Sequence, residues 1–272
     1  MRIQFSYPYW GSKHLSLEVF FRKIKDEGYS GVEMGIPFDI EYTNELSYLL
    51  KKYDLSLIAQ QTIHQANLSA KEYAVKMEEY LYHLASFRPE FINSHTGRDY
   101  YSFSENCELF KVAEVVAAKT GVPILHETHR GRALFCTTMT QKFLDVFPTL
   151  KITADFSHWC CVSESLLQEQ QDFVKTAIRH TNYIHARIGN EQSPQINHPG
   201  DQENERAVNA HIDWWKQIVA RAKETGQKEF WICTEFGPPP YLQTLPFTNR
   251  TVANQFEVNL YMKKLLENTF DK

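Results

Sequence analysis

Short apolar runs alternate with longer segments of helical periodicity along the whole chain. The runs are rich in β-branched and aromatic residues, which is typical of buried strands. They cover residues 3–6, 31–36, 55–61, 91–95, 122–127, 152–155, 183–188 and 230–235. The segments that follow them carry apolar residues on one helical face. They predict helices over residues 15–27, 41–53, 69–87, 105–120, 141–147, 165–180, 204–225 and 249–269.

Local signals support several of these boundaries. Ser69 and Glu72 have the spacing of a capping box, and Gly28 and Gly121 follow predicted helices as glycines often do at helix ends. No linker, charge block or low-complexity tract separates the units. Alternating strands and helices imply a parallel sheet, and eight such units imply closure into a (β/α)8 TIM barrel. The sequence therefore predicts a single domain that spans residues 1–272.

Charge, apolar runs and cysteine spacing argue against several classes of protein. The formal net charge of −4 gives no bulk attraction for nucleic acid, and no run approaches the ~18 apolar residues of a membrane span. No secretory signal pattern follows Met1, and the five cysteines form no CxxC pair. We expect reduced cysteines, a cytoplasmic location, and neither a nucleic-acid nor a membrane partner. A homo-oligomer is compatible with the sequence.

Charged residues fall where the predicted strands end. Glu127, Asp155 and Glu235 close three of the strands, and His185 lies within the one between Asp155 and Glu235. If these strands are neighbours in a parallel barrel, their carboxyl ends bring the four side chains to one place. Three carboxylates held that close repel one another unless a cation lies between them. The pattern predicts one divalent metal ion, with Mn²⁺ or Mg²⁺ favoured by the oxygen-rich set and Co²⁺ or Zn²⁺ as alternatives.

The same positions carry a resemblance to a known superfamily. The sequences at 124–127, 153–158, 184–187, 233–237 and 28–33 resemble the xylose isomerase-like TIM barrel superfamily, and within it the sugar phosphate isomerase/epimerase branch, which includes ketose 3-epimerases and hydroxypyruvate isomerases. The resemblance spans essentially the whole chain. It implies a metal bound by Glu127, Asp155, His185 and Glu235, with His158 near the substrate. The epimerases usually carry an arginine about six residues after the metal histidine, where this chain has Glu191.

The chemistry of such a site is proton transfer next to a carbonyl. A metal that binds the carbonyl and hydroxyl oxygens of a small sugar acidifies the C–H between them and stabilises an enediolate. Glu127 and Glu235 would serve as acid and base: two bases on opposite faces give epimerisation, and one base on a single face gives aldose–ketose isomerisation. His158, Arg187 and His95 are the predicted substrate-binding residues.

Other interpretations of these residues remain open. Each carboxylate, taken alone, fits a helix N-cap, and Arg187 fits an ion pair with Glu191 or Asp155. His95 fits a second-metal ligand or a core histidine. Apurinic endonucleases share this barrel and bind three zinc ions with extra histidines, so a phosphodiester hydrolase is the alternative function. A third reading is a sugar-binding barrel without turnover.

Overall fold

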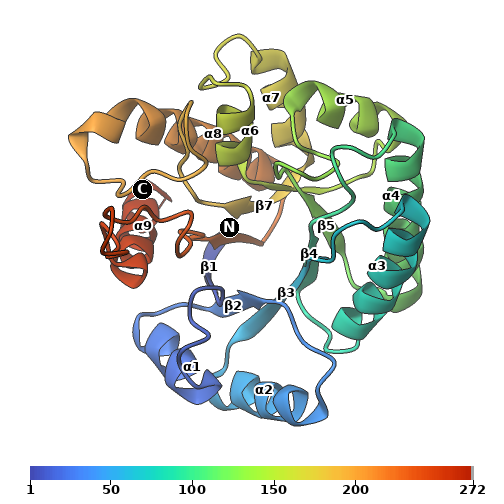
Figure 1. The fold of residues 1–272 in the computed structure, drawn as a ribbon, viewed down its shortest axis with the longest axis horizontal. Helices are drawn as coiled ribbons and strands as arrows, with labels where there is room; N and C mark the ends of the chain where they lie inside the picture. The colour runs from blue at the N-terminus through green and yellow to red at the C-terminus, as the bar shows by residue number, and fades with distance from the viewer. Residues whose placement is uncertain (271–272) are drawn as a thin grey trace.

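Eight parallel strands close into a barrel in the computed structural model, which describes residues 1–270 (Figure 1). The strands pair in chain order, and the last pairs back with the first. This confirms the predicted TIM barrel. Their bounds are β1 Arg2–Pro8, β2 Gly31–Met34, β3 Ser56–Gln61, β4 Phe91–Ser94, β5 Ile124–Glu127, β6 Ile152–Ala154, β7 Thr181–His185 and β8 Glu229–Cys233.

Helices surround the barrel (Figure 1). They are α1 Leu17–Asp26, α2 Ile40–Tyr53, α3 Ala70–Ala85, α4 Phe103–Thr120, α5 Thr137–Val146, α6 Phe156–Val162, α7 Gln171–His180, α8 Glu205–Glu224 and α9 Gln255–Phe270, with a 3-10 turn at Gln202–Asn204. The predicted capping box of Ser69 and Glu72 starts α3. Of the helices within residues 1–270, none combines the length and the apolar character that crossing a membrane requires.

Two apolar clusters hold the strands in place. The larger one lies between the strands and the helices. The smaller one consists of Ile58, Phe91, Leu125, Tyr183, Trp231 and Cys233. Successive strand residues alternate between the two faces of a sheet. The next side chain that points into the barrel therefore lies two residues after each member of the smaller cluster. Those next positions include Asn93, Glu127, His185 and Glu235, so the apolar cluster forms a floor beneath a polar layer.

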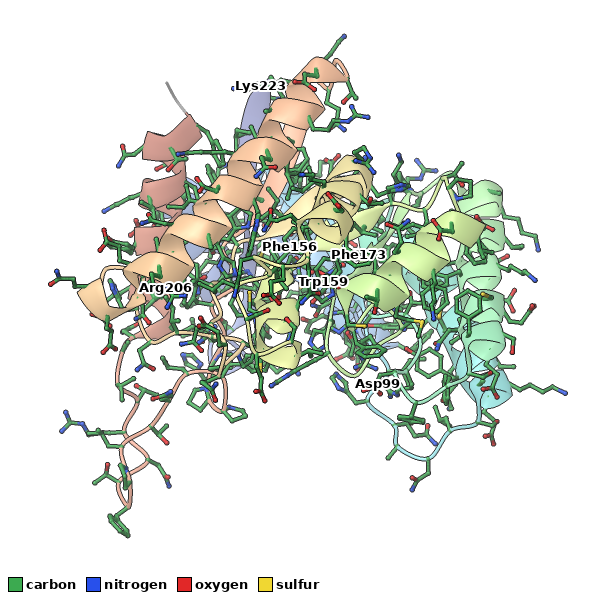
Figure 2. All side chains as sticks on the ribbon, turned by 90° about the horizontal axis from the view of Figure 1, so that it is seen from above. Asp99, Phe156, Trp159, Phe173, Arg206 and Lys223 are labelled. Carbon is green, nitrogen blue, oxygen red and sulfur yellow. The ribbon has the colours of Figure 1, made fainter. Side chains whose placement is uncertain are left out.

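Three predicted helices begin more than two residues away from the observed start. The segment predicted at 165–180 is helical only from Gln171, and α6 was not predicted. The reason is Asp155, whose side chain caps α6 directly after the three-residue strand β6. Figure 2 labels Phe156 and Trp159 of α6, whose rings stack with centroids 4.7 Å apart. The helix predicted at 141–147 begins earlier, at Thr137.

The last helix begins later than predicted, at Gln255 instead of residue 249. The side chain of Asn254 accepts the backbone N–H groups of Phe256 and Glu257, which caps the helix at that point. The chain before it forms an extended turn with a bridge between Thr244 and Thr251. Figure 2 shows this segment between β8 and α9 projecting away from the barrel.

Candidate metal centre

The four predicted metal ligands lie at the carboxyl ends of their strands. Glu127 and His185 are the last residues of β5 and β7, Asp155 follows β6, and Glu235 lies two residues beyond β8. All four side chains are buried. The structure therefore places them in the polar layer above the apolar floor of the barrel.

His185 lies at the centre of this group. Its Nδ1 is 3.5 Å from Oε2 of Glu127 and 3.7 Å from Oε1 of Glu235. Ligand atoms of Glu127, Asp155 and His185 all lie within 4.8 Å of one another. Within the described residues, Nδ1 of His185 is buried and has no hydrogen-bond partner. A buried ring nitrogen without a partner, facing two carboxylates, is the arrangement that a cation would complete.

Glu33 on β2 is a member of the site that sequence reasoning missed. Its Oε2 lies 2.8 Å from Nε2 of His185 and accepts a hydrogen bond from the hydroxyl of Tyr183 at 2.6 Å. A carboxylate on Nε2 holds a proton there, so a metal ion would bind at Nδ1. Burial opposes the charged ring, but Glu235, Glu33 and Glu127 raise the pKa of His185 well above its usual value, so the metal ion would displace a proton from Nδ1. Asn93 joins the two sides of the site, because its amide nitrogen donates to Glu33 at 2.9 Å and to Glu127 at 2.7 Å.

The sequence did contain a signal for Glu33. It alternates with Val32, Met34 and Ile36 along the strand predicted at 31–36. In a closed barrel one face of each strand points into the barrel and the other lies against the helices, so a carboxylate within a strand is buried on either face. Glu33 is in fact buried.

Asp155 acts as a helix cap and as an ion-pair partner at once. One of its oxygens accepts the Ser157 N–H at 3.2 Å, and the other pairs with the guanidinium of Arg187. Burial raises the pKa of Asp155, while Arg187 opposes that shift. Arg187 is thus ion-paired to Asp155, whereas Glu191 is paired to Arg206 at 3.4 Å.

His158 lies against the same guanidinium. Nη2 of Arg187 is 2.6 Å from Nε2 of His158, and since arginine only donates, this nitrogen accepts. Burial, together with His129 and Arg187, holds the pKa of His158 well below its usual value. The neutral ring therefore carries its proton on Nδ1, which is buried and has no partner among residues 1–270. A hydrogen-bond donor is available there for a substrate oxygen.

Glu235 has a strained backbone. Its φ of 56° lies in the left-handed region, which costs a residue other than glycine energy and is found most often at functional sites. Two residues later, a Cβ on Gly237 would meet the indole of Trp10 at 2.0 Å, so only glycine fits this close approach. The segment after β8 is therefore held in one path, which directs Glu235 to His185.

Negative charge is concentrated in the site. Burial, together with the neighbouring carboxylates Glu33 and Glu127, raises the pKa of Glu235 to about 8, although His185 opposes the shift. Burial also works to raise the pKa of Glu127, but His95 and His185 hold it well below its usual value. Four buried carboxylates face one arginine and a few histidines. The residues present fit a divalent cation, because the cation would offset the excess of negative charge and would give Nδ1 of His185 the partner that it lacks.

His95, the remaining predicted site residue, lies on the other side of Glu127. Its Nε2 is 2.7 Å from Oε2 of Glu127. The structure thus brings all the predicted site residues into one region at the carboxyl end of the barrel. A separate cavity of about 1060 Å³ lies at the amino ends of the strands, bordered by Arg2, Tyr29 and Glu90, and contains none of them.

Comparison with known proteins finds solved structures that are similar to the whole chain. No protein-family model matches the chain, and no curated protein matches its sequence. Among solved structures, D-allulose 3-epimerase from Methylomonas sp. is 14% identical, with a TM-score of 0.69 over 99% of this chain and 98% of that one. The probable 3-DHS dehydratase AsbF from Bacillus anthracis is 17% identical, with a TM-score of 0.64 over 97% and 99%. An AP endonuclease, family 2, from Brucella melitensis is 13% identical, with a TM-score of 0.59 over 87% and 93%.

The chain has the same TIM-barrel fold as these solved structures.

Two loops cover the site at the carboxyl end of this barrel. The side chain of Gln195, in the loop after β7, accepts the Gly237 N–H at 2.8 Å and donates to its carbonyl at 3.2 Å. Tyr241 places its ring 4.6 Å from the guanidinium carbon of Arg187 and 5.3 Å from that of Arg130. The loop at 189–199 therefore braces the segment that carries Glu235, and Tyr241 roofs the arginine.

Proposed function

We propose that this protein is a divalent-metal-dependent isomerase or epimerase of a small sugar, sugar acid or related polyol. The observation that carries the proposal is Nδ1 of His185, buried and without a partner, between the carboxylates of Glu127 and Glu235. A metal bound there would supply Lewis acidity to a substrate carbonyl. Glu127, Asp155, His185 and Glu235 would hold it, and the three carboxylates favour Mn²⁺ or Mg²⁺ over Co²⁺ or Zn²⁺.

Glu127 and Glu235 are the proposed acid and base. They approach Nδ1 of His185 from strands three apart in the barrel, so a substrate over the imidazole would have one carboxyl group on each side. A carboxylate within hydrogen-bond reach of a C–H next to a carbonyl removes its proton, and an acid on the opposite face returns one. This arrangement suits epimerisation, whereas return of the proton from the same group gives isomerisation.

His158, Arg187 and His95 are the proposed substrate-binding residues. The Nδ1–H of His158 would donate to a substrate oxygen, and Arg187 would share the negative charge that develops when the proton leaves. The solved structures that the chain resembles support this class of reaction, since one is named an epimerase and another a probable dehydratase. Epimerisation next to a carbonyl and loss of water from such a carbon can both begin with removal of a carbon-bound proton.

The test is exchange of a carbon-bound proton with solvent. The protein, loaded with Mg²⁺ or Mn²⁺, is incubated in D₂O with a panel of ketoses, aldoses and sugar acids, and mass spectrometry detects deuterium in the recovered sugars. We expect exchange with at least one member that stops with EDTA and returns with metal. Glu127→Gln and Glu235→Gln should each slow it by about 10²-fold or more. Glu191→Gln, which alters a surface pair, is the matched control. Exchange that survives in both glutamine variants would overturn the proposal.

Phosphodiester hydrolysis is the second candidate. The likeness to an AP endonuclease and the position of His95 beside Glu127 favour it. The net charge of −4 counts against a polyanionic substrate. Metal-dependent nicking of a duplex with an abasic site, without deuterium uptake by any sugar, would put this candidate first. Sugar binding without exchange would indicate a barrel that binds and does not turn over.

A further inference from the structure

Arg132 is a buried cation that lacks a counterion. Its exposed fraction is 8%, and Nη1 of its guanidinium is buried without a hydrogen-bond partner among residues 1–270. The arginines that form ion pairs within the same residues are Arg2, Arg187 and Arg206. A buried charge without a partner destabilises a folded protein, and an anion bound at Arg132 would remove that penalty.

Backbone contacts fix the turn that carries Arg132. The N–H of Arg132 donates to the carbonyl of His129 at 3.1 Å, which closes a turn directly after β5. Gly131 allows this turn, since its φ of 74° lies in the left-handed region. The N–H of Ala133 donates to the carbonyl of Thr96, in the loop after β4, at 3.0 Å. The turn at 129–132 is therefore tied to the carboxyl end of the barrel.

The same turn borders two of the proposed substrate-binding residues. The ring of His129 lies against that of His158, with centroids 3.8 Å apart. The guanidinium carbon of Arg130 lies 5.3 Å from the ring centre of Tyr241, and that of Arg187 lies 4.6 Å from the same ring centre. The turn at 129–132 thus adjoins the region in which the substrate is proposed to bind.

Positive charge is in excess along this part of the chain. The segment at 128–136, between β5 and α5, contains Arg130 and Arg132 and no acidic residue. A guanidinium presents its N–H groups as a planar fork that matches two oxygens of a carboxylate or a phosphate. The segment is therefore suited to an anion that offers paired oxygens.

We propose that the turn at 129–132 is an anion subsite, in which Arg132 binds a carboxylate or phosphate group of the substrate. The inference rests on the proposed function and narrows its substrate to a sugar acid or a sugar phosphate. Carboxylate and phosphate share the oxygen pair that the guanidinium recognises, and the probes below distinguish them. The subsite uses none of the four proposed metal ligands.

The experiment measures binding and does not depend on turnover. The Mg²⁺-loaded protein is titrated calorimetrically with aldonates, with aldose phosphates and with the neutral alditols of the same chain lengths. We expect a member of one anionic class to bind about tenfold or more tightly than its neutral counterpart. The class that binds identifies the anion as a carboxylate or a phosphate.

Replacement of Arg132 should remove this preference for anions. Arg132→Met should weaken binding of the anionic probe by about tenfold or more and leave the affinity for the neutral alditol unchanged. Arg132→Lys keeps the charge without the fork, so its affinity should lie between those of the wild type and Arg132→Met. Arg206→Met, which changes an exposed arginine, is the matched control and should bind as the wild type does.

Stability separates a ligand-binding role of Arg132 from a structural one. Arg132→Met removes an unpaired buried charge and keeps an unbranched apolar side chain, so the urea midpoint of the ligand-free protein should be unchanged or higher. A guanidinium that supports the fold gives the opposite result. Arg187→Met, which breaks the ion pair with Asp155, should have a lower midpoint and serves as the comparison.

The outcomes for the subsite and for the proposed isomerase are distinct. A lower midpoint in Arg132→Met, anion affinity that this variant leaves unchanged, or neutral probes that bind as tightly as the anionic ones would overturn the subsite. Anion binding that depends on Arg132, without deuterium exchange in any probe, would support the subsite and count against the isomerase. Exchange confined to neutral sugars would support the isomerase and overturn the subsite.

Discussion

The carboxylate of Glu33 on β2 lies 2.8 Å from Nε2 of His185 on β7, across the interior of the barrel. This contact sets which nitrogen of His185 carries the proton, and it turns the other nitrogen to Glu127 and Glu235. The hydroxyl of Tyr183 fixes the same oxygen of Glu33. The metal-binding form of the histidine is therefore prepared by a residue that does not lie among the four proposed ligands.

Replacement of Glu33 should weaken metal binding while the four proposed ligands stay in place. In Glu33→Gln the amide cannot hold the His185 proton as a carboxylate does, and loss of such an orienting partner typically costs about 10–100-fold in metal affinity. Isothermal titration with Mn²⁺ measures the change. Tyr183→Phe keeps the carboxylate and removes only the hydrogen bond from the Tyr183 hydroxyl, so it should have the smaller effect. Unchanged affinity in Glu33→Gln would show that Glu33 does not orient His185.

The ion pair of Arg187 and Asp155 supports a different prediction. Arg187→Met leaves the Asp155 carboxylate buried without its cation, which typically costs about 3–5 kcal/mol. A metal ion on Asp155 would replace part of the lost charge, so Mn²⁺ should stabilise the variant more than the wild type. Urea unfolding with and without Mn²⁺ measures both quantities. Arg206→Met removes an exposed partner of Glu191 and should change little. Equal stabilisation by Mn²⁺ in all three proteins would exclude Asp155 as a ligand.

The barrel was predictable because every strand has a short apolar run and every helix an apolar face. The ends of the elements were less predictable where side chains define them. Asp155 starts α6 by capping it, and Asn254 delays α9, and neither effect shows in the apolar pattern. Such contacts depend on backbone geometry that forms only when the strand before them ends.

The proposed ligands could be named from the sequence because Glu127, Asp155 and Glu235 close predicted strands and His185 lies in the strand between Asp155 and Glu235. Glu33 and Asn93 were missed because both lie within strands, where a polar residue is ordinarily assigned to a solvent-facing side. Closure of the sheet turns that side into the barrel. Glu33 and Asn93 are therefore buried and hydrogen-bonded to each other beside the site. The ion pair of Arg187 with Asp155 was one of two pairings left open, since sequence order does not say which carboxylate a buried arginine reaches.

His211 on α8 should make the fold sensitive to acid. Its Nδ1 donates to the carbonyl of Ala207 at 2.9 Å, and its Nε2 accepts the Gly189 N–H at 3.5 Å, so both nitrogens are used by the neutral ring. Burial lowers the pKa of His211 from 6.5 to about 4. The unfolded chain therefore binds the proton first, and stability that is present above about pH 6.5 is lost as the pH falls towards 4.

Replacement of His211 removes this titration. The shift corresponds to about 3 kcal/mol between these two pH values, so His211→Gln should show a shallower loss of stability over that interval, whatever its stability at neutral pH. Urea unfolding at several pH values between 7 and 4 measures the slope. His180→Gln, at the end of α7, serves as the control and should keep the wild-type slope. The same slope in both variants would rule out His211 as the acid-sensitive group.

The most direct test of the metal centre is anomalous diffraction from a crystal of the protein equilibrated with Mn²⁺. The account predicts an anomalous peak with Nδ1 of His185 and carboxylate oxygens of Glu127, Asp155 and Glu235 each about 2.0–2.3 Å away. Absence of a peak among these four side chains at saturating Mn²⁺, or a peak bound only at other residues, would contradict it.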